Sequence, residues 1–300
     1  MTALPKWAQT RTPAGRITYV NGRYVPHGEA GVHVEDRGLQ LGDSIYEVCN
    51  VSGGVLIDEE PHLDRMERSL REIRMPMPMA RDALKLVMRE VVRRNRVVHG
   101  IIYLQVSRGV ARRDHAAPAA PLKPGLIISA RSVPPSVLEK KLATGVKAIT
   151  RPDERWARRD IKTTQLLPNV LARTDAREAG ALEAWLVDGE GFITEGAVAN
   201  AWIVDASGQV VTRALSNDVL PGVTRQVVLQ AAAEAQLPVV QRKFTVAEAL
   251  AAKEAFITSS TSTAIGVVEI DGRKIGTGEP GPLTRRIHDL YAKKSGLKST

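Results

Sequence analysis

Apolar and polar residues alternate in two stretches near the start of the chain, and each stretch is interrupted by turn-forming residues. In residues 17–25 the interruption is Asn21 and Gly22, a pair that accepts the positive φ angles of a tight turn. Residues 44–51 and 55–58 flank a Ser-Gly-Gly turn in the same way. The pattern therefore predicts two β-hairpins.

The apolar spacing then lengthens to three or four residues, which is typical of helices. Two such series occur, one after Pro61 and one after a break at residues 75–78: Leu63, Met66, Leu70 and Ile73, then Leu84, Val87 and Val91. We expect two amphipathic helices packed on the sheet. The strand pattern returns at 100–106 and 125–130, around a polar loop at 108–123 that is long enough to suggest a function.

Two prolines in residues 132–136 mark the best candidate domain boundary, because proline restricts the chain to extended or turn conformations. We expect a smaller N-terminal α/β domain over residues 1–133 and a larger C-terminal domain over residues 134–300. In the second domain the pattern predicts a strand at 146–150, a helix at 165–179, strands at 184–187 and 201–204, a helix at 224–235, and a closing strand, helix and strand. The expected fold class is mixed α/β (α+β).

Composition narrows the class of protein. Of the 300 residues, 43% are hydrophobic and 25% are charged, as in globular proteins. Residues 1–13 are polar and no apolar run approaches the roughly 18 residues of a membrane span, so we expect a cytoplasmic protein with no membrane partner. Cys49, the only cysteine, lies in an apolar stretch and is expected to be a buried thiol.

The formal net charge of +9 raises the alternative of a nucleic-acid partner. The basic residues are, however, interspersed with acidic ones along helices, as at 67–74, and form no basic runs interleaved with aromatic residues. We therefore expect no nucleic-acid partner and interpret the charge as a solvated basic surface. Such a surface favours anionic small molecules through long-range attraction.

Lys162 is the first candidate for chemistry. It lies in the segment 155–167, RWARRDIKTTQLL, among several arginines and directly before an amphipathic helix with Leu166, Leu167 and Val170 on one side. A lysine whose protonation is disfavoured by neighbouring cations can act as a nucleophile. The chain has 42 lysines and arginines, however, so the residues alone leave a solvated surface lysine as the alternative.

The sequence DIKT and the leucine-rich helix after it resemble the lysine motif of fold-type IV aminotransferases, the pyridoxal-phosphate family of D-amino acid and branched-chain aminotransferases. Five further motifs of this family occur in the family's order along nearly the whole chain: EDRGLQLGDSIYE at 35–47, HLDR at 62–65, ITEGAVAN at 193–200, LPGVTR at 220–225 and TSSTS at 258–262. The resemblance implies a two-domain fold with pyridoxal 5'-phosphate at the domain interface and no metal.

The resemblance assigns a role to each motif. Lys162 would form an imine with the cofactor aldehyde, then move a proton between the substrate α-carbon and the former aldehyde carbon. Glu195 would pair with the protonated pyridine nitrogen, so that the ring remains an electron sink. Arg65 would bind the phosphate, and Leu220 would pack on the cofactor ring. Without the motifs, a turn glutamate, a helix-surface arginine and a core leucine are the alternatives.

A helix expected to begin near Gly222 supplies the rest of the implied phosphate site. Val223 and Thr224 lie where its first-turn N–H groups and positive dipole end would receive the phosphate. Ser260 and Thr261 match the hydroxyl-bearing turn that completes this site in the family, although this sequence has serine where threonine is frequent. Either hydroxyl can donate. An ordinary helix cap is the alternative for the glycine.

The polar loop after residue 106 carries the feature that selects a substrate. Arg113 and His115 fall where D-amino acid aminotransferases have an arginine and a histidine that bind the substrate α-carboxylate, and Tyr46 matches the tyrosine that joins them. In the family this pair reaches into the neighbouring subunit's site, so the resemblance implies a homodimer. A solvated basic loop, or a register that favours Arg112, is the alternative.

The function implied is a ping-pong transamination of D-amino acids through an internal aldimine on Lys162, with 2-oxoglutarate or pyruvate as the acceptor. Branched-chain L-aminotransferases and R-selective amine transaminases share the lysine and phosphate motifs, and aminodeoxychorismate lyase has the same fold. A basic binding protein on a degenerate enzyme fold is the alternative from another class.

Overall fold

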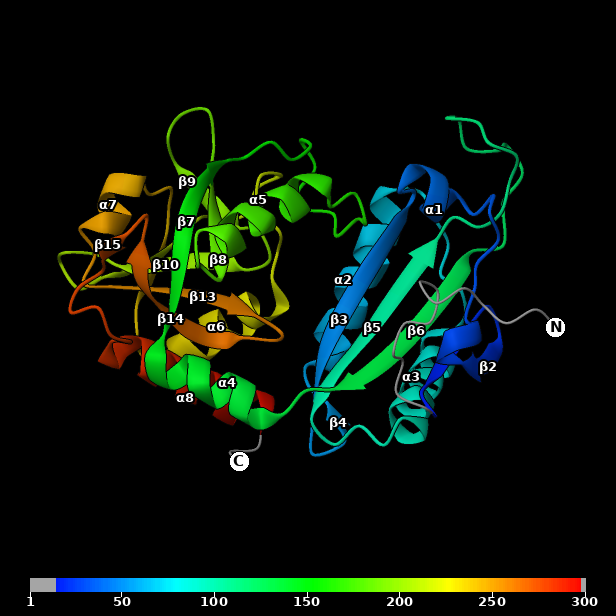
Figure 1. Cartoon of the computed structure of the whole chain (residues 1–300), viewed down its shortest axis with the longest axis horizontal. Coiled ribbons are helices and arrows are strands. Elements are labelled where there is room, and N and C mark those ends of the chain that lie inside the picture. Colours follow the sequence, from blue (N-terminus) through cyan, green and yellow to red (C-terminus); the bar gives the residue numbers. More distant parts are fainter. Residues whose placement is uncertain (1–14, 298–300) are drawn as a thin grey trace. The chain divides into compact units, whose positions relative to one another are not determined.

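The computed structural model describes residues 15–297, and the chain divides into two compact units, Met1–Val133 and Pro134–Thr300. Both units combine a β-sheet with helices, which confirms the mixed α/β class (Figure 1). Residues 1–13, which were expected to contain no leader segment, lie outside the described residues. Across residues 15–297, none of the helices has the length and apolarity that crossing a bilayer requires.

The first unit is built on a six-stranded sheet with the order β2-β1-β6-β5-β3-β4. Its strands are β1 (Ile17–Val20), β2 (Arg23–Pro26), β3 (Ser44–Ser52), β4 (Val55–Leu56), β5 (Gly100–Ser107) and β6 (Gly125–Ser132). Both predicted hairpins are present, since β1 pairs with β2 and β3 pairs with β4. Along β3 and β5, buried and half-buried residues alternate, as expected where one face of a sheet packs on helices.

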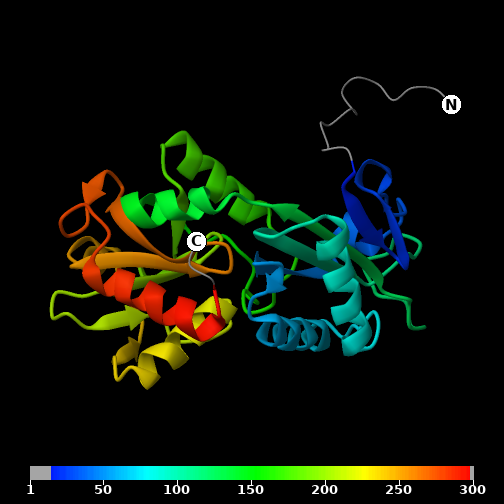
Figure 2. The ribbon, with the colours of Figure 1, turned by 90° about the horizontal axis from the view of Figure 1, so that it is seen from below.

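Helices α2 (Glu59–Glu72) and α3 (Arg81–Arg94) pack against this sheet, on the same side of it (Figure 2). Both were predicted from their apolar spacing. Two short helices were not predicted: η2 (His27–Glu29) and α1 (Arg37–Leu41). The second of these begins where the Asp36 side chain caps the backbone, with Oδ1 accepting from the N–H of Gly38 at 2.9 Å.

The second unit contains a nine-stranded sheet with the order β12-β11-β10-β13-β14-β7-β8-β9, and β15 pairs with β14 outside this path. Its strands are β7 (Val146–Pro152), β8 (Glu183–Val187), β9 (Ile193–Gly196), β10 (Asn200–Val204), β11 (Val210–Thr212), β12 (Val239–Gln241), β13 (Glu254–Ser259), β14 (Thr263–Ile270) and β15 (Arg273–Lys274). Nearly all residues of β8, β9, β10 and β13 are buried, because both faces of the sheet are covered.

The helices of this unit are α4 (Pro135–Thr144), α5 (Leu167–Glu178), α6 (Val223–Glu234), α7 (Val246–Leu250) and α8 (Pro282–Ser295). Ala201 and Ile203 of β10 join a core to which β7, β8, β9, β11, β13 and β14 also contribute, with α4 and α7 packed against it. The intervening Trp202 points to the other face, where α6 and α8 pack. α5 packs on β7 and β8.

Three expectations for the second unit need correction. The prolines at 134–135 start helix α4 rather than an extended segment, because proline suits the first turn of a helix. The described chain closes with α8, not with a strand. α5 buries Ala172 and Ala176, whereas Leu167 and Val170 are 68% and 55% exposed, so the apolar side predicted for this helix faces outward.

Candidate active site

Glu195, near the end of β9, is a buried carboxylate with donors on both oxygens. Only 3% of the residue is exposed. Oε1 accepts from Arg155 Nη1 at 2.6 Å and from the backbone N–H of Leu220 at 3.2 Å, and Oε2 accepts from Asn200 Nδ2 at 2.9 Å. Such donors offset the desolvation that a buried carboxylate suffers. Glu195 can therefore be charged inside the second unit.

Asn200 links this carboxylate to the loop that leads into α6. It is the first residue of β10, and its Nδ2 donates to Glu195 Oε2 and also to the carbonyl of Leu220 at 3.0 Å. Gly222 lies so close to it that a Cβ atom at Gly222 would be 2.0 Å from Asn200 Oδ1. Two predicted site residues, Glu195 and Leu220, and the glycine that begins the helix are thus brought together by one side chain.

Neighbouring charges set the ionisation of Glu195. The pKa of its carboxyl is raised: burial is the largest cause, the nearby Asp153 adds to the rise, and Arg155 opposes it without cancelling it. Arg225, buried in α6, is a further cation that faces Glu195, and burial lowers the pKa of its own guanidinium to about 10. The two arginines favour the ionised carboxylate, which is the form that can pair with a protonated ring nitrogen.

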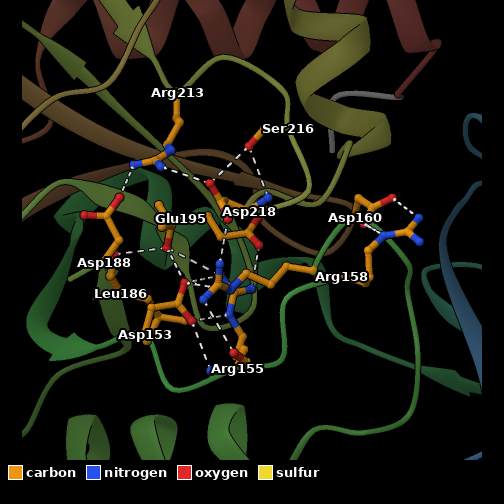
Figure 3. Close-up of polar contacts among 12 residues, drawn as sticks. Asp153, Arg155, Arg158, Asp160, Leu186, Asp188, Glu195, Arg213, Ser216 and Asp218 are labelled. Atoms are coloured by element: carbon orange, nitrogen blue, oxygen red, sulfur yellow. Dashed lines mark hydrogen bonds and ion pairs between the residues drawn. The ribbon is translucent and has the colours of Figure 1, made fainter. Parts of the chain in front are cut away.

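Charged side chains around Glu195 form a series of alternating sign (Figure 3). From Glu195 the ion pairs run, in order, through Arg155, Asp153, Arg159, Asp218, Arg213 and Asp188. The backbone N–H of Arg159 also donates to the carbonyl of Asn217 at 2.9 Å. The series therefore connects the segment before Lys162 with the loop before α6.

Lys162 lies in an irregular segment between β7 and α5 and is half-buried. The two residues before it, Asp160 and Ile161, are 3% and 4% exposed. Arg158 Nε donates to Asp160 Oδ1 at 2.9 Å, and the N–H of Thr163 donates to the carbonyl of Ile161 at 2.8 Å. The backbone is thus held on both sides of a lysine that remains partly accessible, which suits a nucleophile.

The start of α6 fits a phosphate group. Gly222 is the N-cap and provides no side-chain cap, so the first-turn N–H groups are suited to an anion. Val223 and Thr224 are each 2% exposed, and Thr224 Oγ1 has no hydrogen-bond partner among the described residues. A buried hydroxyl without a partner is costly unless a ligand or water engages it. The residues present therefore match the donors that a phosphate requires.

The turn between β13 and β14 carries Ser260 and Thr261. The first is half-buried and the second is exposed, with Thr261 Oγ1 3.3 Å from Ser259 Oγ. Because Thr258 pairs with Asn200 in the register of β13 and β10, this turn starts beside the residue that contacts the buried carboxylate. Its hydroxyls are thus placed in the same unit as the start of α6.

Arg65, the predicted phosphate arginine, is buried in the first unit. Its Nε and Nη2 donate to Glu47 Oε1 and Oε2 at 2.8 and 2.7 Å, and His62 Nδ1 lies 2.7 Å from Oε2. Desolvation acts to raise the pKa of Glu47, but Arg65 and His62 outweigh it and lower this pKa to about 2. Two hydrogen bonds to one carboxylate therefore fix the guanidinium, and its role toward a phosphate stays a prediction.

The three predicted substrate residues also belong to the first unit. Tyr46, on β3, is half-buried and stacks on Tyr103 with the ring centroids 5.8 Å apart. Arg113 and His115 are exposed on the loop between β5 and β6. Arg37 holds this loop, with Nη1 donating to the backbone carbonyl between those two residues at 2.7 Å. Their joint action on one carboxylate stays a prediction.

Three residues outside the predicted set complete the geometry around Glu195: Asn200, Arg155 and Asp153. Asn200 and Arg155 lie within the motifs ITEGAVAN and RWARRDIKTTQLL, so membership of a motif was a usable signal for both. Asp153 precedes its motif and carries no such signal.

Comparison with known proteins extends these observations. The sequence profile of the family described as amino-transferase class IV matches residues 44–270. The chain is 39% identical over 267 residues to a D-alanine aminotransferase from Bacillus licheniformis. This alignment covers 89% of this chain and 93% of that protein. It is 37% identical over 277 residues to a D-alanine aminotransferase from Listeria innocua, with coverage of 92% and 94%.

Solved structures with the same fold include two branched-chain amino acid aminotransferases. The one from Escherichia coli superposes with a TM-score of 0.85 at 24% identity and covers 95% of this chain and 96% of that chain. The one from Thermoproteus uzoniensis, with norvaline, has a TM-score of 0.80 at 26% identity and covers 94% of this chain and 96% of that chain. Both likenesses support the mixed α/β fold described above.

Proposed function

Because the chain belongs to the class IV aminotransferase family, we propose that it transfers the amino group of a D-amino acid to a 2-oxo acid, 2-oxoglutarate or pyruvate, with pyridoxal 5'-phosphate as cofactor. The structural observation that carries this proposal is the buried Glu195 linked by hydrogen bonds to the loop that begins α6. A carboxylate and an anion site in one unit suit the ring nitrogen and the phosphate of this cofactor. Identity with D-alanine aminotransferases supports the substrate class.

The residues of the second unit have separate tasks in this proposal. When bound, pyridoxal 5'-phosphate withdraws electrons from the substrate α-carbon, so that its proton can leave. Lys162 would hold the cofactor through Nζ until the substrate amine displaces it. The freed amine of Lys162 would then accept the α-proton and return it to the cofactor carbon that Nζ had held. Glu195 accepts a hydrogen bond from the ring nitrogen. Leu220 packs on the ring. The phosphate is bound by Val223, Thr224, Ser260 and Thr261, together with Arg65 of the first unit.

Substrate recognition in the proposal rests on the first unit. Arg113 and His115 bind the α-carboxylate together with Tyr46, because a guanidinium, an imidazole and a phenol can all donate to one carboxylate. The loop is exposed in a single chain, so its side chains are accessible to the active site of a neighbouring subunit. The proposal therefore includes a homodimer, and it places the enzyme in the cytoplasm.

Branched-chain L-amino acid transamination is the second candidate. The similarity to the Thermoproteus uzoniensis branched-chain enzyme, with a TM-score of 0.80 at 26% identity, favours it over R-selective amine transamination and over the lyase reaction. The D-alanine aminotransferases are more similar in sequence and cover about as much of the chain, which is why D-amino acids are proposed first.

The cofactor proposal is tested by spectroscopy and by trapping. The protein with pyridoxal 5'-phosphate should absorb in the visible range, and borohydride should fix the cofactor on the peptide that contains Lys162. Lys147, a surface lysine of β7 that pairs with Glu269, is the control: K147A should label as the wild type does, whereas K162A should not. A label that persists in K162A would contradict the assignment.

The substrate proposal is tested by competing donors. D-alanine and D-glutamate should react faster than their L-enantiomers, L-leucine, L-isoleucine and (R)-1-phenylethylamine, each with a 2-oxo acid acceptor. A clear preference for L-leucine or L-isoleucine would favour the second candidate and would remove the role given to the loop of Arg113 and His115.

A further inference from the structure

Arg155 is fixed between two carboxylates just after β7. Its Nε and Nη2 donate to Asp153 Oδ1 and Oδ2 at 2.9 and 2.8 Å, while Nη1 donates to Glu195 Oε1 at 2.6 Å. Only 9% of its side chain is exposed. A forked guanidinium that donates in two directions at once cannot rotate without losing one partner.

Asp153 is itself fixed, so the guanidinium has a rigid support. None of the Asp153 side-chain surface is exposed, and its Oδ2 accepts from Thr194 Oγ1 at 2.7 Å. The same Thr194 oxygen lies 3.1 Å from the carbonyl oxygen of Leu186 on the neighbouring strand. The position of Arg155 is therefore tied to the backbone of β8 and β9, the strand that carries Glu195 (Figure 3).

The donors around Glu195 are distributed unequally between its two oxygens. Oε1 accepts a hydrogen bond from Arg155 Nη1 at 2.6 Å and one from the backbone N–H of Leu220 at 3.2 Å. Oε2 receives Asn200 at 2.9 Å and an almost equal share of the Leu220 N–H at 3.3 Å. The shared N–H does not distinguish the two oxygens, but the side-chain donors do: Oε1 accepts from a charged guanidinium at the shorter distance, and Oε2 accepts from a neutral amide. Because a charged hydrogen bond is stronger than a neutral one, Oε2 is the oxygen more open to a further donor.

We propose that Arg155 is a positioning residue for the cofactor: it fixes Glu195 as an anion and occupies Oε1, so that Oε2 is the oxygen that accepts the ring N–H. The inference rests on the proposed function, because it concerns the same carboxylate. It assigns Arg155 no contact with the cofactor itself. Its effect is transmitted through one hydrogen bond.

The electrostatic surroundings of Glu195 agree with this role. Burial raises the pKa of the carboxyl and Arg155 lowers it, while Asp153 raises it further. Arg225 is the other cation that faces Glu195, and it acts without a direct hydrogen bond to it. Loss of Arg155 leaves burial and Asp153 to favour the protonated carboxyl, which cannot form an ion pair with a ring N–H.

The inference is tested with two ligands that differ at one ring atom: pyridoxal 5'-phosphate and the analogue in which C–H replaces the ring nitrogen. Affinities of the cofactor-free protein for both are measured by titration. The wild type should prefer the natural cofactor by about tenfold to a hundredfold, the range of a charged hydrogen bond. R155M should lose most of that preference while its affinity for the analogue changes little. R155K, which keeps the charge but not the fork, should be intermediate.

R151M is the matched control, since Arg151 pairs at the surface with Asp175 and not with Glu195. It should keep the wild-type preference. Wild-type preference in R155M would overturn the inference, as would an equal loss of affinity for both ligands, which indicates a merely structural role. If R155M does not fold, the test depends on R155K alone. A wild-type preference for pyridoxal 5'-phosphate over the analogue in R155K then overturns the inference. A wild type that binds neither ligand would instead overturn the proposed function.

Discussion

Three buried glutamates differ in ionisation because their partners differ. Glu47 is held by Arg65 and His62, and its pKa falls to about 2. Glu183, at the start of β8, lies 3.7 Å from Arg173 and has one oxygen without a hydrogen-bond partner among the described residues, and burial raises its pKa to about 7. Burial also raises the pKa of Glu195, and Arg155 opposes that rise. Burial alone therefore does not decide the charge of a carboxyl.

Loss of the Glu47 carboxylate should destabilise the first unit strongly. E47Q leaves the buried guanidinium of Arg65 without its counter-charge, which costs about 3 to 5 kcal/mol. Because the pKa of Glu47 falls from 4.5 to about 2, its contribution is present above pH 4.5 and is lost as the pH falls toward 2. Urea unfolding at several pH values measures both effects.

Glu90 provides the control for this prediction. Its pKa is also lowered to about 2, by Arg93 and Arg94, but the group lies at the surface of α3, where its partners are exposed to water. Water and salt screen such pairs, so E90Q should change unfolding little at any pH. Equal effects of E47Q and E90Q would show that burial of the Glu47 pair has no energetic consequence.

Glu183 should give the second unit the opposite pH dependence. Its pKa is higher in the folded protein than the ordinary 4.5, so folding binds a proton, and stability falls as the pH rises from 4.5 to about 7. A rise of this size corresponds to roughly 3 kcal/mol at most. E183Q is neutral at every pH and should remove this slope. A wild type and an E183Q variant with parallel pH profiles of unfolding free energy would contradict the assignment.

Single residues were easier to predict than their partners. Lys162 and Glu195 are identified by motifs. Arg155 and Glu195, however, lie 40 positions apart. They meet because β8 pairs both with β7, which precedes Arg155, and with β9, which carries Glu195. The hydrogen bond from Arg65 to Glu47 depends in the same way on how α2 packs on β3. Local sequence patterns contain no information on such register.

At the scale of elements, long periodic helices were predicted, and short strands were predicted only where a turn signal marks a hairpin. α2, α3, α5 and α6 span at least three turns, so their apolar spacing repeats often enough to be recognised. The strands β9, β11 and β15 have four, three and two residues, too few for an alternation to show. The positioning of Glu195 on such a short strand depends on hydrogen bonds from its neighbours.

The contact between Asn200, at the start of β10, and Gly222, the N-cap of α6, should be sensitive to a single added methyl group. In G222A the new Cβ would lie 2.0 Å from Asn200 Oδ1, so Asn200 would have to move away from Glu195 and Leu220. Overpacking of this kind costs about 1 to 3 kcal/mol, and the affinity for pyridoxal 5'-phosphate should fall as well. Thermal unfolding and cofactor titration measure the two losses.

Gly189 is the matched control, because a Cβ atom there meets nothing within 4 Å. G189A should leave both stability and cofactor affinity close to those of the wild type. If G222A behaves like G189A, then the loop before α6 can move away from Asn200 without consequence, and the contact has no part in the site.

At the scale of the whole molecule, the predicted residues are divided between the two units. Tyr46, Arg113 and His115 belong to the first, and Lys162 and Glu195 belong to the second. The family profile matches residues 44–270, so both sets of residues fall inside the matched region. The resemblance implies that the loop of one subunit serves the lysine of its partner in a homodimer.

If each active site is shared between two subunits, two inactive variants should restore each other's activity when they form a mixed dimer. K162A lacks the lysine, and the double variant R113A/H115A lacks the loop side chains, so each homodimer should transaminate D-alanine poorly. If the subunits are mixed and allowed to exchange, about half of the dimers become hybrids, and each hybrid has one site with both the lysine and the loop intact. Activity should therefore rise to about a quarter of the wild-type value. Each variant taken through the same exchange alone is the control. Mixtures that stay as inactive as the separate variants would show that each chain serves its own lysine.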